Sequence, residues 1–278
     1  MDGRRNLKVG LALSGGGGRG YAHIGVIKVL EKNNIPIDFI AGSSAGALFG
    51  ALYSFLKDSQ ELEKISLDND FRKFLNFMVD PSFKGGLIKG DKIRKYISEI
   101  INDANFDDLK IPFKALATDF DTAEAVVLSE GDVSLAVQAS ASFPFIFKPV
   151  LWGDKILWDG GMSNPLPVDI VREMGADIVI GVNLYNQTMF ENKNKSKENA
   201  YWVFVKSLGA LQYSLAKECL KSADIVINPS VENFGLIGLD SFLKGRGRDF
   251  ILEGERAAEF VLPAIKELVK GLGSWANR

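Results

Sequence analysis

The chain has 278 residues, of which 46% are hydrophobic and 24% are charged, and its formal net charge is −2. It is long enough to bury a large core, and its composition is ordinary for a globular protein. The absence of a basic excess disfavours a nucleic-acid partner. One cysteine and one histidine exclude an intramolecular disulfide framework and a zinc site built from these two residue types.

The first predicted elements are a strand, a glycine-rich loop and a helix. Lys8 to Leu13 is apolar enough for a short buried strand, and apolar residues recur with helical spacing from Tyr21 to Asn33. Between them, Gly15–Gly20 contains four consecutive glycines followed by Arg19. Such a loop presents unobstructed backbone N–H groups beside a helix N-terminus, which suits an oxyanion hole as well as a phosphate cradle.

The same loop also matches a dinucleotide-binding pattern. Gly15, Gly17 and Gly20 satisfy G-x-G-x-x-G, and Asp38 would be the acid that binds the ribose. However, a ribose-binding acid normally ends its strand, whereas Asp38 precedes a second glycine-rich turn. A nucleotide-binding protein therefore stays an alternative that is less favoured than an oxyanion hole.

That second turn has the sequence of a nucleophile elbow. The apolar run Ile37 to Ala41 predicts a buried strand, and an Ala/Leu/Phe-rich helix follows the turn. Between them, Gly42, Ser44 and Gly46 form G-x-S-x-G in the strand–turn–helix context that an elbow requires. Side chains two residues before and after the serine would clash in so sharp a turn, so glycine is needed there. The spacing selects Ser44 over the neighbouring serine, although close packing of small residues would give the same sequence.

Residues 58–110 are more polar and less regular, with helical spacing over 71–78 and 92–101. The apolar residues at 71, 74, 75 and 78 lie on one face of the first of these helices. Packing of this face on the core is favoured over a role as an acyl-chain or membrane-facing surface.

The next stretch places three carboxylates after predicted strands. Strands are expected over 111–117, over 125–128 and as a pair within 150–158, with a helix over 133–141. Asp119 and Asp121 follow the first strand, and we interpret them as solvated loop acids without a catalytic role. Asp159 follows the strand pair and precedes Gly160 and Gly161, so its carboxylate stands on a tight turn with little steric cover, although a common Asp-Gly turn looks the same.

The rest of the chain continues the alternation of helices and strands. The sequence predicts helices over 168–174, 201–220 and 249–270 and strands over 178–184 and 223–228, with Pro263 bending or dividing the last helix. We find no repeat and no linker. The pattern therefore predicts one α/β domain over residues 1–278 with a mainly parallel sheet, in which 58–110 and 186–250 are variable segments near the active site.

The histidine count restricts the mechanism. A serine nucleophile usually has a histidine base, but His23 is the only histidine and precedes Ser44, which excludes the Ser–acid–His order of α/β-hydrolases. We expect His23 to pack or form a hydrogen bond. The base is then a carboxylate, and Asp159 is the best placed. Burial beside Ser44 would raise the pKa of Asp159 and make it a stronger base.

Taken together, the elbow at Ser44, the preceding loop Gly15–Gly20 and the later Asp159-Gly160-Gly161 resemble the patatin-like phospholipase family, especially its small bacterial members. The likeness extends from Val9 to about Gly181. It implies a three-layer α/β/α fold and an acyl hydrolase with a Ser–Asp dyad. Ser44 would then be the nucleophile and Asp159 the general base. The backbone N–H groups of Gly16, Gly17, Gly18 and Arg19 would form the oxyanion hole, and Gly15, Gly20, Gly42, Gly46, Gly160 and Gly161 would support the motifs.

The resemblance implies esterase or phospholipase A activity on fatty acyl esters of lipids through an acyl-enzyme, without a metal or organic cofactor. An acyltransferase would use the same residues, and a non-catalytic protein would keep the motifs. No signal-peptide pattern is evident, so we expect a cytoplasmic protein. Peripheral contact with a membrane is a further hypothesis, suggested by 71–78 and Phe234–Leu239, while the oligomeric state is left open.

Overall fold

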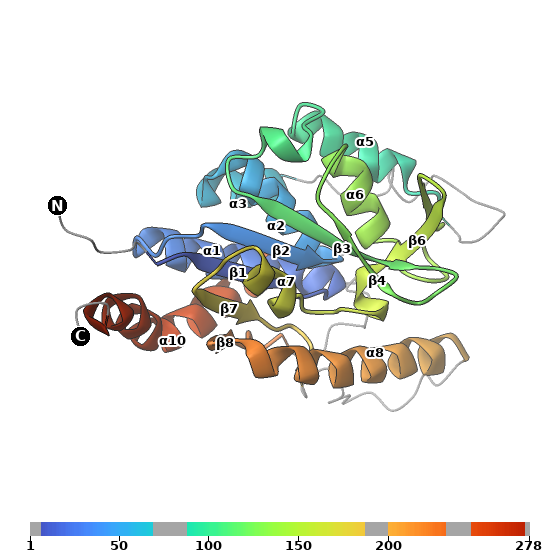
Figure 1. Cartoon of the computed structure of the whole chain (residues 1–278). Coiled ribbons are helices and arrows are strands. Elements are labelled where there is room, and N and C mark those ends of the chain that lie inside the picture. Colours follow the sequence, from blue (N-terminus) through green and yellow to red (C-terminus); the bar gives the residue numbers. More distant parts are fainter. Residues whose placement is uncertain (1–6, 69–87, 187–199, 232–245, 276–278) are drawn as a thin grey trace.

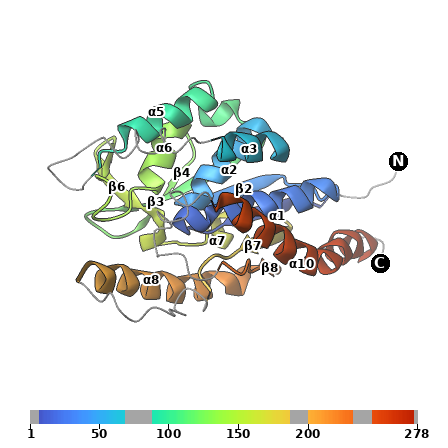
Figure 2. The same cartoon turned by 180° about the vertical axis from the view of Figure 1, so that it is seen from behind.

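The computed structural model of this chain describes residues 7–68, 88–186, 200–231 and 246–275. A central sheet lies between two layers of helices, as Figure 1 and the reverse view in Figure 2 show. The sheet has eight strands in the order β5-β6-β3-β2-β1-β7-β8, with β4 paired to β3. The expected α/β fold with helices on both faces of the sheet is therefore confirmed.

The strands are β1 (Val9–Leu13), β2 (Phe39–Ser43), β3 (Phe113–Asp119), β4 (Ala125–Leu128), β5 (Val150–Trp152), β6 (Lys155–Asp159), β7 (Ile178–Val182) and β8 (Ile225–Ile227). The α-helices are α1 (Tyr21–Lys32), α2 (Ala45–Leu56), α3 (Ser59–Leu67), α5 (Asp91–Ile100), α6 (Val133–Ser140), α7 (Val168–Glu173), α8 (Ala200–Cys219) and α10 (Gly247–Trp275). Among the described residues, no helix is long and apolar enough to cross a membrane.

The sheet is parallel in its middle and antiparallel at one end. Strands β3, β2, β1, β7 and β8 run parallel, so their carboxyl ends meet at one edge. By contrast, β4 and β6 run antiparallel to β3, and β5 runs antiparallel to β6. The expectation of a mainly parallel sheet thus holds for its centre, and the antiparallel end is an addition that the strand pattern did not predict.

Alternating side chains of the parallel strands build one core on each face of the sheet. Leu11 and Leu13 of β1 belong to the larger core, which they share with α1, α2, α6 and α10. The intervening Ala12 belongs to a smaller core, in which Val168 and Val171 of α7 pack on the opposite face. Because the strands are covered on both sides, nearly all their residues are buried, as is usual for parallel sheets.

Helix α10 lies unusually close to α1. A Cβ placed on Gly25 would lie 1.9 Å from the carbonyl oxygen of Ile251, and one on Gly254 would lie 2.0 Å from that of Ala22. The two backbones therefore touch where the glycines cross. Helix α10 also continues through Pro263, so of the two expectations for this proline, a bend or a division of the helix, the division is wrong. Pro263 is exposed, and water can replace the hydrogen bond that its ring removes.

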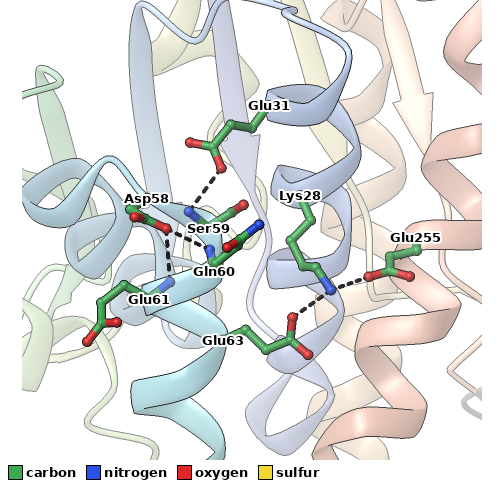
Figure 3. Close-up of polar contacts among 8 residues, drawn as sticks. All are labelled: Lys28, Glu31, Asp58, Ser59, Gln60, Glu61, Glu63 and Glu255. Carbon is green, nitrogen blue, oxygen red and sulfur yellow. Dashed lines mark hydrogen bonds and ion pairs between the residues drawn. The ribbon is translucent and has the colours of Figure 1, made fainter.

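Helix α3 was not predicted, because residues 58–110 read as polar and irregular. Its N-cap explains why it forms. The Asp58 carboxylate accepts hydrogen bonds from the backbone N–H groups of Gln60 and Glu61, both at 2.9 Å (Figure 3). The proposed surface segments 71–78 and Phe234–Leu239 lie outside the described residues.

A lysine joins three helices on one side of the molecule (Figure 3). Lys28 Nζ of α1 lies 2.5 Å from a carboxylate oxygen of Glu63 in α3 and 2.5 Å from one of Glu255 in α10. Partial burial lowers the pKa of Lys28, but hydrogen bonds and charge from the two glutamates outweigh this effect and raise it. Glu31 adds a second link, because its carboxylate accepts a hydrogen bond from the Ser59 backbone N–H at 3.0 Å.

Replacing Lys28 with Met should leave Glu63 and Glu255 facing each other without a cation. We expect the free energy of unfolding to fall by about 2 kcal/mol, because removing one member of a partly buried ionic group leaves uncompensated charge. Urea denaturation would measure this loss. The matched control is Lys64→Met, which removes an exposed ion pair with Glu61 and should cost no more than about 0.5 kcal/mol. Equal losses in the two variants would contradict the role assigned to Lys28.

Candidate active site

Ser44 stands at the turn between β2 and α2 in a conformation that non-glycine residues rarely adopt, with φ 53° and ψ −117°. The surrounding backbone leaves no room for side chains. A Cβ on Gly46 would lie 2.1 Å from the Leu13 carbonyl oxygen, and one on Gly42 would lie 2.3 Å from the carbonyl oxygen of Gly46 itself. The two glycines of the G-x-S-x-G sequence are therefore required by close contact with main chain, which cannot move aside.

A second serine fixes the backbone of the turn. The N–H of Ser44 donates a hydrogen bond to Ser140 Oγ at 2.9 Å, and Ser140 Oγ donates to the carbonyl oxygen of Leu116. Ser140 is fully buried at the end of α6. It thereby connects the elbow to β3 and holds the strained residue in place.

Strand β6 brings Asp159 to the elbow. Residues 115–116 of β3 pair with β2 on one side and with β4 on the other, while residues 117–118 pair with β6 and β4. It follows that β2 and β6 share the same edge of β3. Since β6 runs antiparallel to β3, the two strands meet carboxyl end to carboxyl end, at Ser43 and Asp159.

The two side chains are in direct contact there. Ser44 Oγ donates a hydrogen bond to Asp159 Oδ2 at 2.7 Å, and the backbone N–H of Gly161 donates to Asp159 Oδ1 at 2.7 Å. Asp159 is completely buried. Burial raises the pKa of its carboxyl to about 6, although the hydrogen bonds from Ser44 and Gly161 oppose this shift.

The glycine-rich loop also lies beside Ser44. A Cβ on Gly15 would lie 3.3 Å from Ser44 Cβ, and one on Gly20 would lie 2.7 Å from Ala45 Cβ. The N–H of Gly15 donates to the Pro165 carbonyl at 3.1 Å. By contrast, the N–H groups of Gly16–Gly18, where a 3-10 helix begins at Gly17, have no hydrogen-bond acceptor within the described part of the chain.

Arg19 differs from the three glycines before it. Its backbone N–H donates to the Gly16 carbonyl at 3.2 Å, so this N–H, which was expected to serve an oxyanion hole, is already paired. Its buried guanidinium donates to the carbonyl oxygens of Gly16, at 3.0 Å, and Leu184, at 3.1 Å. Burial lowers the pKa of Arg19 to about 10, so it stays a cation at neutral pH. Arg19 thus stabilises the loop through these two side-chain hydrogen bonds.

His23 also supports this loop. It is completely buried in α1, and its Nε2 lies 2.8 Å from the carbonyl oxygen of Ser14. Burial lowers the pKa of His23 to about 4, so the ring is neutral at physiological pH and donates from Nε2. The interpretation of His23 as a packing and hydrogen-bonding residue is confirmed.

The other carboxylates lie apart from the elbow. Asp38 precedes β2 and accepts hydrogen bonds from Lys8 Nζ at 2.7 Å and the Val9 N–H at 2.9 Å. It therefore stands at the amino ends of β1 and β2, opposite the glycine loop, which removes the basis for a ribose contact. Asp119 is 6% exposed, so the interpretation as a solvated acid is wrong for it. Its carboxylate accepts N–H bonds from Asp121 and Thr122, and the Asp121 bond is the main reason that its pKa is lowered.

Two residues near the dyad were not singled out from the sequence, Tyr185 and Gln212. A Cβ on Gly161 would lie 3.1 Å from Tyr185 Oη and 2.7 Å from Gln212 Nε2. Tyr185 follows the carboxyl end of β7, where functional residues of parallel sheets gather, so this signal was present in the sequence. Gln212 lies within helix α8, and no local pattern distinguishes it.

Comparison with known proteins places this site in a family context. The family model described as patatin-like phospholipase matches residues 11–172, which include Ser44 and Asp159. An uncharacterized NTE family protein of Mycobacterium tuberculosis is 34% identical over 185 residues, which are 66% of this chain and 51% of that protein. Patatin-like phospholipase domain-containing protein 6 of Homo sapiens is 30% identical over 186 residues, 64% of this chain and 13% of that protein.

The chain thus spans about half, or less, of the length of these two relatives. Among solved structures, the crystal structure of VipD from Legionella pneumophila has a TM-score of 0.65, with 14% sequence identity. The likeness covers 94% of this chain and 67% of that one. At this identity the likeness concerns the fold.

The raised pKa of Asp159 predicts that this residue lowers stability at neutral pH. Between its ordinary value of 3.8 and about 6, the folded chain keeps a proton that the unfolded chain has released, so wild-type stability falls as pH rises through this window. Asp159→Asn does not titrate. We expect this variant to be about 2 kcal/mol more stable than wild type at pH 8, with most of this gain lost at pH 4.

Denaturant unfolding of both proteins at the two pH values would measure the effect. Because all other titrating groups are common to both, their contributions cancel in the difference between wild type and variant. A stability difference that is the same at pH 4 and pH 8 would contradict a raised pKa at Asp159.

Proposed function

This chain belongs to the patatin-like phospholipase family, and we propose on this basis that it is a serine acyl hydrolase that cleaves fatty acyl esters of lipids. One observation carries the proposal. Ser44 Oγ, at the tip of a strained elbow, donates a hydrogen bond to a buried carboxylate at 2.7 Å. A hydroxyl that donates to a buried carboxylate at this distance supports a nucleophile–base pair. We assign Ser44 as the nucleophile and Asp159 as the general base.

In the proposed first step, Ser44 Oγ attacks the ester carbonyl carbon while its proton passes to Asp159 Oδ2. A carboxylate whose pKa is about 6 is a better base at neutral pH than an ordinary aspartate, because it binds a proton more tightly. The second oxygen, Oδ1, is fixed by the Gly161 N–H, so the carboxylate keeps its orientation as the proton moves.

The negative charge that develops on the carbonyl oxygen needs donors on the opposite side of Ser44. The backbone N–H groups of Gly16, Gly17 and Gly18 have no acceptor in the described part of the chain, and their loop flanks Ser44. We therefore assign the oxyanion hole to these three glycines. Arg19 contributes a buried positive charge that favours the oxyanion and holds the Gly16 carbonyl away from it.

In the second step, Asp159 returns its proton to the leaving alkoxide, and water then replaces the alcohol. Asp159 removes a proton from this water as it attacks the acyl carbon. As the bond between the acyl carbon and Ser44 Oγ breaks, Asp159 gives this proton to Oγ, and the fatty acid leaves. Every step uses groups of this chain and water. Strands from both ends of the chain join one sheet, which favours one catalytic domain over two.

Labelling with a fluorophosphonate probe, followed by mass spectrometry, tests the nucleophile. We expect one adduct per chain on Ser44, none in Ser44→Ala, and labelling of Asp159→Asn slowed by about 100-fold, because the base is lost. The matched control is Ser43→Ala, which removes a neighbouring buried hydroxyl that has no hydrogen-bond partner among the described residues and should be labelled as fast as wild type. An adduct that persists in Ser44→Ala would reject the assignment.

The pH dependence of kcat/KM for an uncharged ester tests the base. The reaction requires Asp159 without its proton, so activity should rise about tenfold per pH unit below about pH 6 and become level above it. His23, whose pKa is about 4, stays neutral through this range and should contribute no second transition above pH 5. A midpoint near 4, the ordinary value for aspartate, would contradict the assignment of a buried base.

A further inference from the structure

Two polar side chains meet beside Asp159 that lie beyond the residues matched by the family model, Tyr185 and Gln212. A Cβ placed on Gly161 would lie 2.9 Å from Asp159 Oδ1, 3.1 Å from Tyr185 Oη and 2.7 Å from Gln212 Nε2. All three polar groups therefore surround one point. Tyr185 Oη also approaches the glycine loop, because a Cβ on Gly15 would lie 2.3 Å from it and 3.3 Å from Ser44 Cβ.

The backbone of Tyr185 is fixed at both of its polar groups. The Asn183 side chain accepts a hydrogen bond from the Tyr185 N–H at 3.0 Å and donates one to its carbonyl at 3.2 Å. The preceding Leu184 donates its N–H to Ser14 Oγ at 2.9 Å and accepts from Arg19. The guanidinium of Arg19 lies 5.9 Å from the centre of the Tyr185 ring. These contacts fix the backbone at Tyr185 and the position of its ring.

The polar ends of both side chains are unpaired within the described residues, although both residues are nearly buried. Tyr185 is 3% exposed and Gln212 is 5% exposed. Within the described residues, neither the Tyr185 hydroxyl nor the Gln212 amide has a hydrogen-bond partner. Unlike Ser43 Oγ, which is unpaired and sealed from solvent, neither polar end is fully enclosed, so both can pair with a ligand that enters the site. Burial, followed by the charge of Asp159, raises the pKa of Tyr185, so its hydroxyl keeps its proton.

The reaction steps that take place next to Asp159 indicate what these groups would bind. The proton that Asp159 takes from Ser44 must pass to the alkoxy oxygen of the ester, so that oxygen comes next to this carboxylate. The attacking water of the second step occupies the same position, because it enters where the alcohol left. The glycine N–H groups, by contrast, serve the carbonyl oxygen.

We propose that Tyr185 Oη donates a hydrogen bond to the alkoxy oxygen of the ester, and later to the attacking water, while the Gln212 amide binds the alcohol portion of the substrate. This inference rests on the proposed function. As the acyl carbon–oxygen bond breaks, the electron pair stays on the alkoxy oxygen. Asp159 supplies the proton, and Tyr185 keeps its own. The alcohol side of the substrate is thus a polar, hydrogen-bonding group such as a glycerol ester.

The position of Gln212 gives this assignment a structural basis. Helix α8 lies on the face of the sheet that also carries α7 (Figure 1), and its last residue, Cys219, packs on the smaller core there. Gln212 and Ala216 are buried on the inner side of α8, whereas Leu211 and Leu215 are exposed. The helix therefore turns one polar side chain toward the dyad.

The variant Tyr185→Phe tests the proposal because it removes only the hydroxyl and keeps the ring beside Arg19. We expect steady-state hydrolysis of a monoacylglycerol to fall by about 10- to 100-fold, as for the loss of one hydrogen bond to a developing charge. The burst of nitrophenol from a p-nitrophenyl ester should keep nearly its wild-type rate, since nitrophenolate leaves without a donor. Labelling by the fluorophosphonate, whose fluoride also leaves without a proton, should be unchanged.

Gln212→Met should raise KM for the monoacylglycerol and leave the p-nitrophenyl ester unaffected. Tyr213→Phe is the matched control, since this neighbouring tyrosine lies beside Lys217 on α8; it should match wild type in every assay. Unchanged monoacylglycerol hydrolysis by Tyr185→Phe would overturn the proposal, and so would labelling that slows in parallel with hydrolysis, because that would place Tyr185 with the oxyanion donors. If wild type itself were not labelled, the proposed function would fail instead.

Discussion

The proposed chemistry depends most on the hydrogen bond between Ser44 Oγ and Asp159 Oδ2, and this contact depends on the direction of one strand. The backbones of neighbouring parallel strands are about 4.8 Å apart and run side by side. Here, β2 and β6 pair with the same edge of β3, one after the other, and they run in opposite directions. The two chain ends therefore meet in line, and the serine and the carboxylate touch. The antiparallel end of the sheet, β4 to β6, is what allows this meeting.

Such closeness explains why glycines surround the site. At Gly46 and Gly160 the groups that a side chain would strike are main-chain atoms: a Cβ on either glycine would lie 2.1 Å from a carbonyl oxygen, that of Leu13 for Gly46 and that of Leu116 for Gly160. Carbonyl groups of sheet strands cannot shift without breaking the sheet, so these positions are more restrictive than a contact with a flexible side chain. Leu116 also accepts the hydrogen bond of Ser140, which holds the Ser44 N–H. Strand β3 thus restricts the backbone next to both Ser44 and Asp159, and it thereby fixes the distance between the two side chains.

The sequence was sufficient for features that depend on neighbouring residues. The order of strands and helices and the elbow at Ser44 follow from local periodicity and glycine spacing, and the structure has these elements close to the predicted bounds. Features that depend on pairing between distant segments were not predicted. The burial of Asp119 arises from the turn it caps, and the position of Gln212 arises from the packing of α8 across the sheet. The Asp58 cap of α3 is a local signal in the sequence, but the segment as a whole is polar, so this signal alone does not predict the helix.

The charges around the dyad show a further constraint on a carboxylate base. A cation in contact with Asp159 would lower its pKa and weaken it as a base. Arg19 is buried nearby, yet its guanidinium donates to the carbonyl oxygens of Gly16 and Leu184, and the ring of Tyr185 lies against it. Tyr185 is affected by both charges, since Asp159 raises its pKa and Arg19 lowers it. The neutral Tyr185 is thus near both charges, while the guanidinium of Arg19 donates to carbonyl oxygens. Arg19 is thereby kept from neutralising the carboxylate, while its charge still acts on the glycine loop where an oxyanion would form. In the proposed mechanism, this arrangement would let one small site hold a carboxylate with a raised pKa and a positive field at the same time.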